Sequence, residues 1–237
     1  MSEPASTAWA PSAGGHRTLA ERAFSALHDG IVSGDLAPGQ RLRIDELAVA
    51  LQVSHLPIRE AIRQLENRGL VEHTPHRGAR VTELSLDDLR QLYDARLLIE
   101  PEIIQRSAVE FTEADAVVAR ELLDRYTLGS ERLEPAALWQ AHTDFHFALY
   151  NASRSSWFIR LVTPLWESSQ RYRMSIRTLS ADQRNAEAAF EHEELLAACV
   201  AHDARRAATV LHDHLAKTAN LIIREMGGDG LIPLIGA

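Results

Sequence analysis

The chain has 237 residues, and a domain usually takes roughly 100 to 200, so the sequence can build one or two hydrophobic cores. Apolar residues make up 46% of it and charged residues 24%, which excludes a chain that is disordered over most of its length. No apolar run is long enough to span a membrane, and the N-terminus lacks the order of a signal peptide. We therefore expect a cytoplasmic protein with no membrane partner.

The net charge of −8 argues at first against a nucleic-acid partner, but the charge is unevenly distributed. Residues 1–82 hold nine Arg and nine acidic residues, so all of the excess negative charge lies in residues 83–237. The N-terminal third can therefore present a local positive face on an acidic protein. Charge alone permits DNA binding without predicting it.

The chain begins with a segment that shows no periodicity. Residues 1–16 are rich in Ser, Ala, Gly and Pro, which predicts a flexible arm. The first helix begins near Thr18, where apolar residues start to recur at steps of three and four, and it ends at the turn of residues 34–39. A short amphipathic helix is predicted over residues 44–51.

A tight turn separates that helix from the next one, for which Ser54 is the predicted N-cap and Pro57 lies in the first turn. The apolar residues of this helix face inward, Arg59 and Arg63 face outward, and Gly69 ends it. Leu70 to Val81 then have the pattern of a short hairpin, whose tip would be a wing formed by His76, Arg77 and Gly78.

From Ser85 to Met226 the sequence has helical periodicity throughout. Ser85 is the predicted N-cap of a helix whose buried stripe would be Leu86, Leu89, Leu92, Ala95 and Leu98. Further helices are expected at about residues 113–128, 135–151, 157–176, 182–199 and 203–226. The predicted fold class is mainly α, with three helices and a small β-hairpin followed by an all-α antiparallel bundle of six or seven helices. Residues 227–237 are expected to be a flexible tail, and Cys199 a buried structural residue.

Residues 42–81 carry the most specific pattern in the chain. They resemble the winged helix-turn-helix of the GntR family of bacterial transcription regulators, with Pro-Ile-Arg-Glu-Ala-Ile in the recognition helix and a Gly-Leu-Val exit into the wing. The resemblance implies that residues 17–82 form a DNA-binding domain whose partner is a double-stranded operator. A single such domain touches few base pairs, so we expect a homodimer on a near-palindromic site.

The predicted DNA contacts lie at the start of the recognition helix and in the wing. Arg59 and Arg63, spaced i and i+4, share one face, and a guanidinium can bind guanine O6 and N7 or bridge phosphates. The alternative is a solvated face on which Glu60 or Glu66 pairs with these arginines. The full predicted set is Ser54, His55, Arg59, Arg63, Arg77 and Gly78. His55 stands where members of the family usually carry Arg.

Residues 93–104, 139–153 and 191–215 resemble, in this order, the FCD domain, which is the ligand-sensing domain of the FadR-type branch of the same family. The resemblance implies that residues 85–226 bind a small effector, and that this binding changes the operator affinity of the DNA-binding domains. It implies a regulator and not an enzyme, and a repressor, because repression is commoner in the family.

Four histidines of this part have the spacing found in metal-binding members of the family. His142 and His146 are i and i+4 on one helix, and His192 and His214 lie 22 residues apart. His142 departs from the family pattern, which has Asp or Asn at this position. A single helical His is more often a core residue, so the prediction rests on all four together. An all-imidazole set suits a divalent transition ion, with Zn²⁺ or Ni²⁺ the first choices.

The effector is predicted to be a small carboxylate that binds at free positions of the ion. Three arginines are candidates for pairing with its charge: Arg96, Arg173 and Arg177. A structural salt bridge between Arg96 and Glu100 is the alternative for the first of them.

Two other functions stay open. Some members of the branch bind an acyl-coenzyme A ligand without a metal. The run His142-Thr-Asp-Phe-His146 also has the ligand spacing of zinc hydrolases, but position 143 is Thr where that motif needs a Glu base, which argues against a metal-dependent hydrolase.

Overall fold

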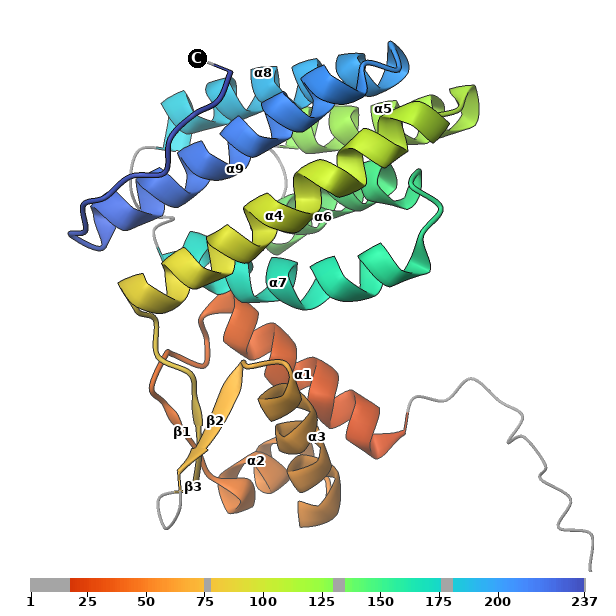
Figure 1. The fold of residues 1–237 in the computed structure, drawn as a ribbon. Coiled ribbons are helices and arrows are strands. Elements are labelled where there is room, and N and C mark those ends of the chain that lie inside the picture. Colours follow the sequence, from red (N-terminus) through yellow and green to blue (C-terminus); the bar gives the residue numbers. More distant parts are fainter. Residues whose placement is uncertain (1–17, 75–77, 130–134, 176–180, 237) are drawn as a thin grey trace, which may run out of the picture.

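The computed structural model describes residues 18–74, 78–129, 135–175 and 181–236. Figure 1 shows an N-terminal unit of three helices and a small sheet, and a bundle of longer helices whose helix α7 faces it. The predicted fold class, mainly α with a helical bundle after a winged helix-turn-helix, is confirmed. Within the described ranges, no helix combines the length and the apolar character needed to cross a bilayer.

The first helix, α1, spans Leu19–Ser33 and begins where the sequence predicts. Thr18 and Glu21 form a capping box, in which the Thr18 hydroxyl accepts from the Glu21 N–H at 3.1 Å and the Glu21 carboxylate accepts from the Thr18 N–H at 2.7 Å. Gly34 ends the helix with φ at 87°, a left-handed conformation that glycine adopts at little cost. The local sequence therefore fixes both ends of α1.

The helix-turn-helix consists of α2, Ile44–Leu51, and α3, His55–Asn67. Ser54 precedes α3 in an extended conformation, as an N-cap does, but its side chain makes no capping hydrogen bond. The inward face of α3 is formed by the apolar side chains that the sequence pattern assigned to it, Ile58, Ala61, Ile62 and Leu65. They pack against the inner face of α1 in one hydrophobic core.

The small sheet has three strands where the sequence predicts two. β2, Val71–Thr74, and β3, Gly78–Val81, pair antiparallel with Val71 opposite Val81. β1, Arg41–Leu42, pairs with the other edge of β3, which gives the order β1-β3-β2. Because β1 has only two residues, it shows no alternation that a sequence pattern could reveal.

The bundle contains six helices in the described ranges. They are α4, Leu86–Glu110; α5, Glu113–Gly129; α6, Pro135–Asn151; α7, Ser156–Ser175; α8, Ala181–Val200; and α9, Ala204–Glu225. Helix α4 begins where it was predicted, and both ends of the other five lie within two residues of the predicted positions. Ser85 caps α4 by accepting from the Asp88 N–H at 3.1 Å, as predicted. The main core of the bundle includes side chains from all six helices.

The buried stripe of α4 differs from the prediction after its second turn. Leu98, expected inside, is 79% exposed, whereas Arg96 and Glu100 are buried. Arg96 and Glu100 form an ion pair, and a buried ion pair can occupy core positions that a pattern of apolar residues would not assign to charged side chains. The prediction for Leu98 is therefore wrong.

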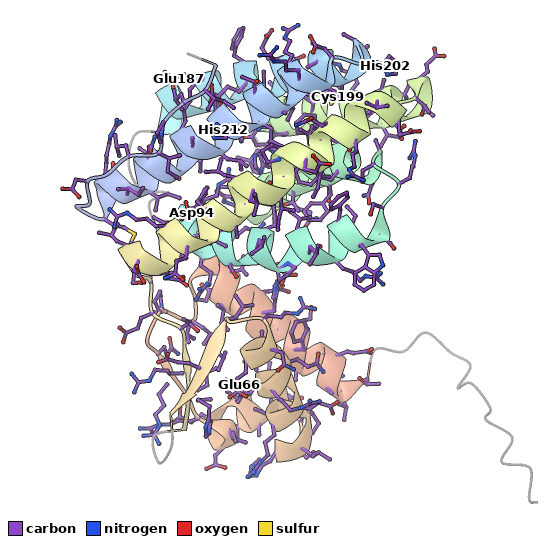
Figure 2. All side chains as sticks on the ribbon, viewed as in Figure 1. Glu66, Asp94, Glu187, Cys199, His202 and His212 are labelled. Carbon is purple, nitrogen blue, oxygen red and sulfur yellow. The ribbon has the colours of Figure 1, made fainter. Side chains whose placement is uncertain are left out.

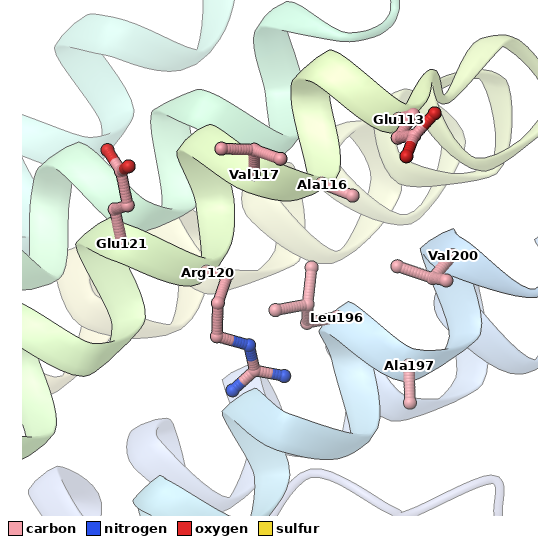
Figure 3. Close-up of a pocket in the computed structure, with 8 residues that line it drawn as sticks. All are labelled: Glu113, Ala116, Val117, Arg120, Glu121, Leu196, Ala197 and Val200. Carbon is pink, nitrogen blue, oxygen red and sulfur yellow. The ribbon is translucent and has the colours of Figure 1, made fainter.

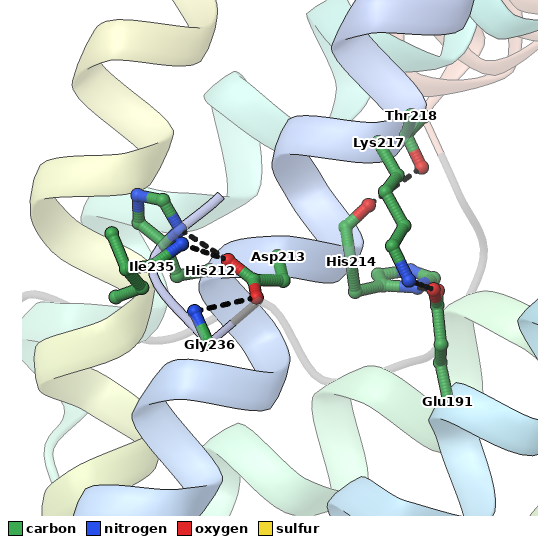
Figure 4. Close-up of polar contacts among 8 residues, drawn as sticks. All are labelled: Glu191, His212, Asp213, His214, Lys217, Thr218, Ile235 and Gly236. Carbon is green, nitrogen blue, oxygen red and sulfur yellow. Dashed lines mark hydrogen bonds and ion pairs between the residues drawn. The ribbon is translucent and has the colours of Figure 1, made fainter. Parts of the chain in front are cut away.

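Residues 227–236 return along α9. The Asn220 amide exchanges two hydrogen bonds with the backbone of Ile232. The Asp213 carboxylate accepts from the N–H groups of Ile235 and Gly236 (Figure 4). The described part of the tail is thus bound to the helix that carries His214.

Cys199, labelled in Figure 2, is buried in α8 as predicted. Burial raises the pKa of its thiol to about 12, so it remains protonated at neutral pH.

Candidate metal centre and nucleic-acid interface

The four predicted histidines converge in the bundle. His142 and His146 come from successive turns of α6, His192 from α8 and His214 from α9. All four are buried, and one ring nitrogen of each lies within 4.8 Å of those of the others. The structure therefore brings the full predicted ligand set together.

The hydrogen bonding of this cluster is incomplete. The Nδ1 atoms of His142, His146 and His192 are buried without a hydrogen-bond partner among the residues that the structure describes. The Nε2 atoms of His146 and His192 face each other at 3.1 Å. Buried polar atoms are nearly always paired, so three orphaned imidazole nitrogens in one place need an explanation. Four imidazole nitrogens gathered within 4.8 Å of one another could hold a divalent transition ion after small movements of the rings.

Burial, more than any other cause, holds the pKa values of His142, His146 and His192 well below their usual 6.5. The positive charge of Arg173 acts in the same direction on all three. These rings are therefore neutral at pH 7, and the neutral imidazole is the form that binds a metal.

Glu191 holds the fourth ring in position, as Figure 4 shows. Its carboxylate lies 2.7 Å from His214 Nδ1 and accepts from Lys217 Nζ at 2.6 Å. Burial opposes ionisation of Glu191, but the pairs with His214 and Lys217 prevail and lower its pKa. An anionic Glu191 accepts a hydrogen bond from Nδ1–H of His214, which leaves the unprotonated Nε2 of that ring free to bind a metal.

Aromatic rings and one arginine surround the cluster. Tyr126 lies 5.1 Å from His142, and Trp166 lies 4.9 Å from His146, between ring centroids. The guanidinium of Arg173 stacks 4.6 Å above Trp139, and its Nη2 lies 3.5 Å from His142 Nε2. A cation therefore faces the cluster from one side.

Arg96 is held as a structural ion pair, the alternative considered from the sequence. Its Nε donates to Glu100 at 2.5 Å, and the Tyr150 hydroxyl donates to the same carboxylate at 2.6 Å. Its Nη1 and the hydroxyl of Tyr93 are buried without a partner among the described residues. Of the other two predicted effector arginines, Arg173 lies at the cluster and Arg177 lies outside the described residues.

The recognition helix α3 presents its two predicted arginines to solvent. Arg59 and Arg63 are exposed, and neither forms an ion pair with any residue that the structure describes, including Glu60 and Glu66. His55 is also exposed, and its Nε2 lies 3.3 Å from Asp45 of α2. The two guanidinium groups are thus available to a ligand.

The wing is described only in part, because Arg77 lies outside the described residues. Gly78 opens β3 with φ at 79°, which a residue with a side chain would adopt at a cost. The exposed side chain of Arg41 in β1 lies beside Gly78. Sequence reasoning missed Arg41, because only the pairing of β1 with β3 brings it to the wing.

Sequence reasoning also missed the surroundings of the four histidines. Tyr126, Trp139 and Glu191 come from three different helices, and no spacing along the chain relates them. Only the position of Glu191 directly before His192 could have drawn attention to it.

A groove of about 540 Å³ lies between α5 and α8 (Figure 3), and none of the four histidines lines it. It is lined mainly by apolar side chains, among them Val117 and Leu196, and also by Glu113, Arg120 and Glu121. Its residues offer no metal-binding set like that of the four histidines.

Comparison with known proteins gives two family matches in series. Residues 19–81 match the bacterial regulatory proteins of the gntR family, and residues 91–217 match the FCD domain. The chain is 34% identical over 223 residues to the uncharacterized HTH-type transcriptional regulator BphR of Paraburkholderia xenovorans (strain LB400). This match covers 89% of this chain and 87% of BphR. It is 27% identical to the HTH-type transcriptional repressor GlaR of Escherichia coli (strain K12), over 86% and 95% of the two chains.

Solved structures agree on the fold. The E. coli protein McbR/YncC superposes with a TM-score of 0.78 at 20% identity, over 89% of this chain and 100% of that one. A putative GntR transcriptional regulator from Rhodococcus sp. RHA1 gives a TM-score of 0.72 at 24% identity. With both domains matched in order, the chain belongs to the GntR family of bacterial transcription regulators, in the group that carries an FCD domain.

Proposed function

We propose that this regulator is a metal-dependent repressor, which binds its operator as a homodimer in the cytoplasm and responds to a small carboxylate effector. The observation that carries the proposal is the set of four buried imidazoles, three of which have an orphaned nitrogen. Their neutral state and all-nitrogen chemistry support Zn²⁺ or Ni²⁺ as the first candidates. Repression is supported by the relative GlaR, which is named a repressor.

An ion that takes five or six ligands would keep open positions beside the four imidazoles, and an oxygen ligand could bind there. Arg173 is the residue best placed to pair with the charge of a carboxylate there, because its guanidinium already faces His142. We assign Arg177 the same role on its sequence position alone. Arg96 acts through Glu100 as part of the core rather than as a free cation.

At the other end of the molecule, Arg59 and Arg63 would enter the major groove, with Ser54 and His55 at the start of the same helix. Arg77 and Gly78 would approach the backbone or the minor groove from the wing. To these predicted contacts we add Arg41, whose exposed side chain lies beside Gly78.

The homodimer is supported by the exposed apolar groove between α5 and α8. Val117 is 53% exposed and Val200 is 51% exposed, and apolar surface of this kind is common in subunit contacts. We expect Val117→Glu to lower the dimer fraction, as measured by sedimentation, whereas Val49→Glu on the DNA-binding unit should leave it unchanged. A dimer that survives Val117→Glu unchanged would place the subunit contact elsewhere.

The metal is tested by elemental analysis of protein that is purified without chelators. About one equivalent of ion per chain is expected in the wild type, and His146→Ala should bind the ion at least about 100-fold more weakly in a calorimetric titration. His212→Ala is the matched control, because His212 lies on α9 but pairs with Asp213 outside the cluster. Wild-type protein that holds only a trace of metal and takes up none on titration would refute the proposal and favour a metal-free effector such as an acyl-coenzyme A.

Hydrolysis is not favoured by the contacts of Thr143. Its hydroxyl accepts from Trp166 Nε1 at 3.2 Å and from Gln170 Nε2 at 3.1 Å, so it serves as a structural acceptor where a hydrolase needs a carboxylate base. The neighbouring Asp144 accepts from Gln140 at 2.7 Å on another face of α6.

A further inference from the structure

Helix α7 contacts α6, the helix that carries His142 and His146, through Trp166, Gln170 and Arg173. Trp166 and Gln170 both donate to Thr143, which is adjacent to His142 in α6. Arg173 reaches His142 itself. A change at the cluster that moves α6 or Arg173 therefore acts directly on α7.

The same helix contacts the DNA-binding unit through Glu167. Both carboxylate oxygens of Glu167 lie 2.9 Å from Arg68 Nη1, and Arg68 is the C-cap residue of the recognition helix α3. His28 Nε2 of α1 lies 3.7 Å from the same carboxylate, within ion-pair distance. One side chain of the bundle thus contacts two helices of the DNA-binding unit.

The segment between the two units is also bound to α7. Arg171 Nη1 donates to the Thr82 carbonyl at 3.1 Å, and the Tyr172 hydroxyl contacts both the backbone of Ser85 and the Asp88 carboxylate. Consecutive turns of α7 therefore hold the DNA-binding unit and the connection that leads into α4.

The charges at Glu167 favour this arrangement. Burial opposes ionisation of Glu167, but His28 and Arg68 prevail and lower its pKa. Glu167 in turn raises the pKa of His28 against the effect of burial, with a smaller contribution from Asp29 on the same helix. The charged groups that face His28 are Glu167 from α7 and Asp29 from α1, and Arg68 stacks on the neighbouring Phe24 ring at 4.6 Å.

We propose that Glu167 is a positioning residue, which fixes the recognition helix α3 on the bundle through Arg68 and His28. The second part of the proposal is that α7 transmits the metal-bound or metal-free state of the histidine cluster to α3. The positioning role of Glu167 is supported by its contacts with Arg68 and His28 and requires no metal ion. The second part rests on the proposed function, because it requires an ion at the cluster. We call the contacts of Glu167 with Arg68 and His28 the clamp. If these contacts can form and break, the two states of the clamp would present α3 at two different places relative to the bundle.

The test uses the full chain and the variant Glu167→Gln, which keeps the size of the side chain and removes its charge. The matched control is Glu102→Gln, because Glu102 forms an exposed pair with Arg106 of its own helix only. Hydrogen exchange of the amides in α1 and in residues 82–85 reports on the clamp, and we expect about fivefold faster exchange in Glu167→Gln. The Zn²⁺ content should equal that of the wild type.

Transmission is measured with Zn²⁺ alone as the probe and with a duplex selected from a random pool by the wild-type protein. Zn²⁺ should change the duplex affinity of the wild type and of Glu102→Gln, and should change that of Glu167→Gln less than about twofold. Adding Arg68→Gln to Glu167→Gln should accelerate exchange little further, since the two residues act as one pair.

Wild-type exchange in Glu167→Gln, or additive effects of the two substitutions, would overturn the positioning role. A full Zn²⁺ response in Glu167→Gln would overturn transmission through the clamp. Absence of Zn²⁺ binding in the wild type would instead overturn the proposed function, and the exchange measurement would still decide the positioning role.

Discussion

The two units of this protein use arginine in opposite ways. Arg59 and Arg63 of the DNA-binding unit lie in solvent without an ion-pair partner in the described chain, whereas Arg96 of the bundle is 1% exposed and is paired with Glu100. An exposed cation costs the fold little and remains available to a ligand, but a buried cation requires a partner and becomes part of the core. Surface function can therefore be altered without loss of the fold, while substitution of a buried charge such as Arg96 or Glu100 also destabilises the fold.

The strongest test of this contrast uses two ion pairs on α4 with the same i, i+4 spacing. Glu100→Gln leaves the Arg96 charge buried without its partner, and we expect a loss of about 3–5 kcal/mol in the free energy of unfolding. Glu102→Gln breaks the exposed pair with Arg106 and should cost at most about 0.5 kcal/mol. Urea unfolding in the presence of a chelator measures both without a contribution from metal binding. Equal losses would contradict the distinction between the two pairs.

The exposed arginines should show the reverse behaviour. Arg59→Ala and Arg63→Ala are each expected to weaken binding to a selected duplex by about 1–3 kcal/mol, because each removes a contact to a base or phosphate, and to leave stability within about 0.5 kcal/mol. Fluorescence anisotropy at fixed salt measures the affinity. Arg205→Ala, an exposed residue of α9, is the control. If both variants kept sequence-selective binding, α3 would not be the reading helix.

A substitution of Glu191 tests the bundle at a position where we expect metal affinity to change and the fold to be retained. Glu191→Gln removes the anion that accepts the hydrogen bond from His214 Nδ1–H, and we expect metal affinity to fall about 10- to 100-fold, as for other residues that orient a metal ligand. Competition with a chromogenic chelator gives the affinity. Glu194→Gln, which removes a surface pair with Arg206, should leave it unchanged. Equal affinities for both variants would show that His214 needs no such partner.

The smallest expected effect is a dependence on pH at the contact between the two units. Because the folded-state pKa of His28 is raised above 6.5, its pairing with Glu167 stabilises the protein below pH 6.5, and this contribution is lost as the pH rises through the raised value. The stability difference between the wild type and His28→Gln should therefore be at most about 1 kcal/mol below pH 6.5 and should decrease as the pH rises through the raised pKa of His28. If the stability difference between the wild type and His28→Gln grew with pH, it would contradict a protonated, positively charged His28 at this contact.

Much of the fold could be predicted from the sequence because its signals are local. The Thr18 cap, the Ser85 cap and the six bundle helices follow from capping residues and from apolar periodicity. The two errors have different causes. β1 is visible only against β3, which is distant in the sequence, and such pairing leaves no trace in a window of one strand. Leu98 is exposed while Arg96 and Glu100 are buried as an i, i+4 ion pair, and a pattern of apolar residues does not assign charged side chains to the core.

The candidate site divides in the same way. The four histidines were found from their spacing within a family pattern, and the structure brings them together. Their surroundings could not be found, since Tyr126, Trp139 and Glu191 become neighbours only when α5, α6 and α8 pack. The clamp at Glu167 joins residues 99 positions apart in the chain, which no sequence motif could indicate.

The buried state of Cys199 has a practical consequence. It is the only cysteine in the chain, and burial holds its thiol in the unreactive, protonated form. A cysteine introduced on the surface of α3 or α4 would therefore react with a spin label or a fluorophore, while Cys199 would be labelled very little. The distance between two such probes, measured with and without metal, would report directly on movement between the units in an otherwise natural sequence.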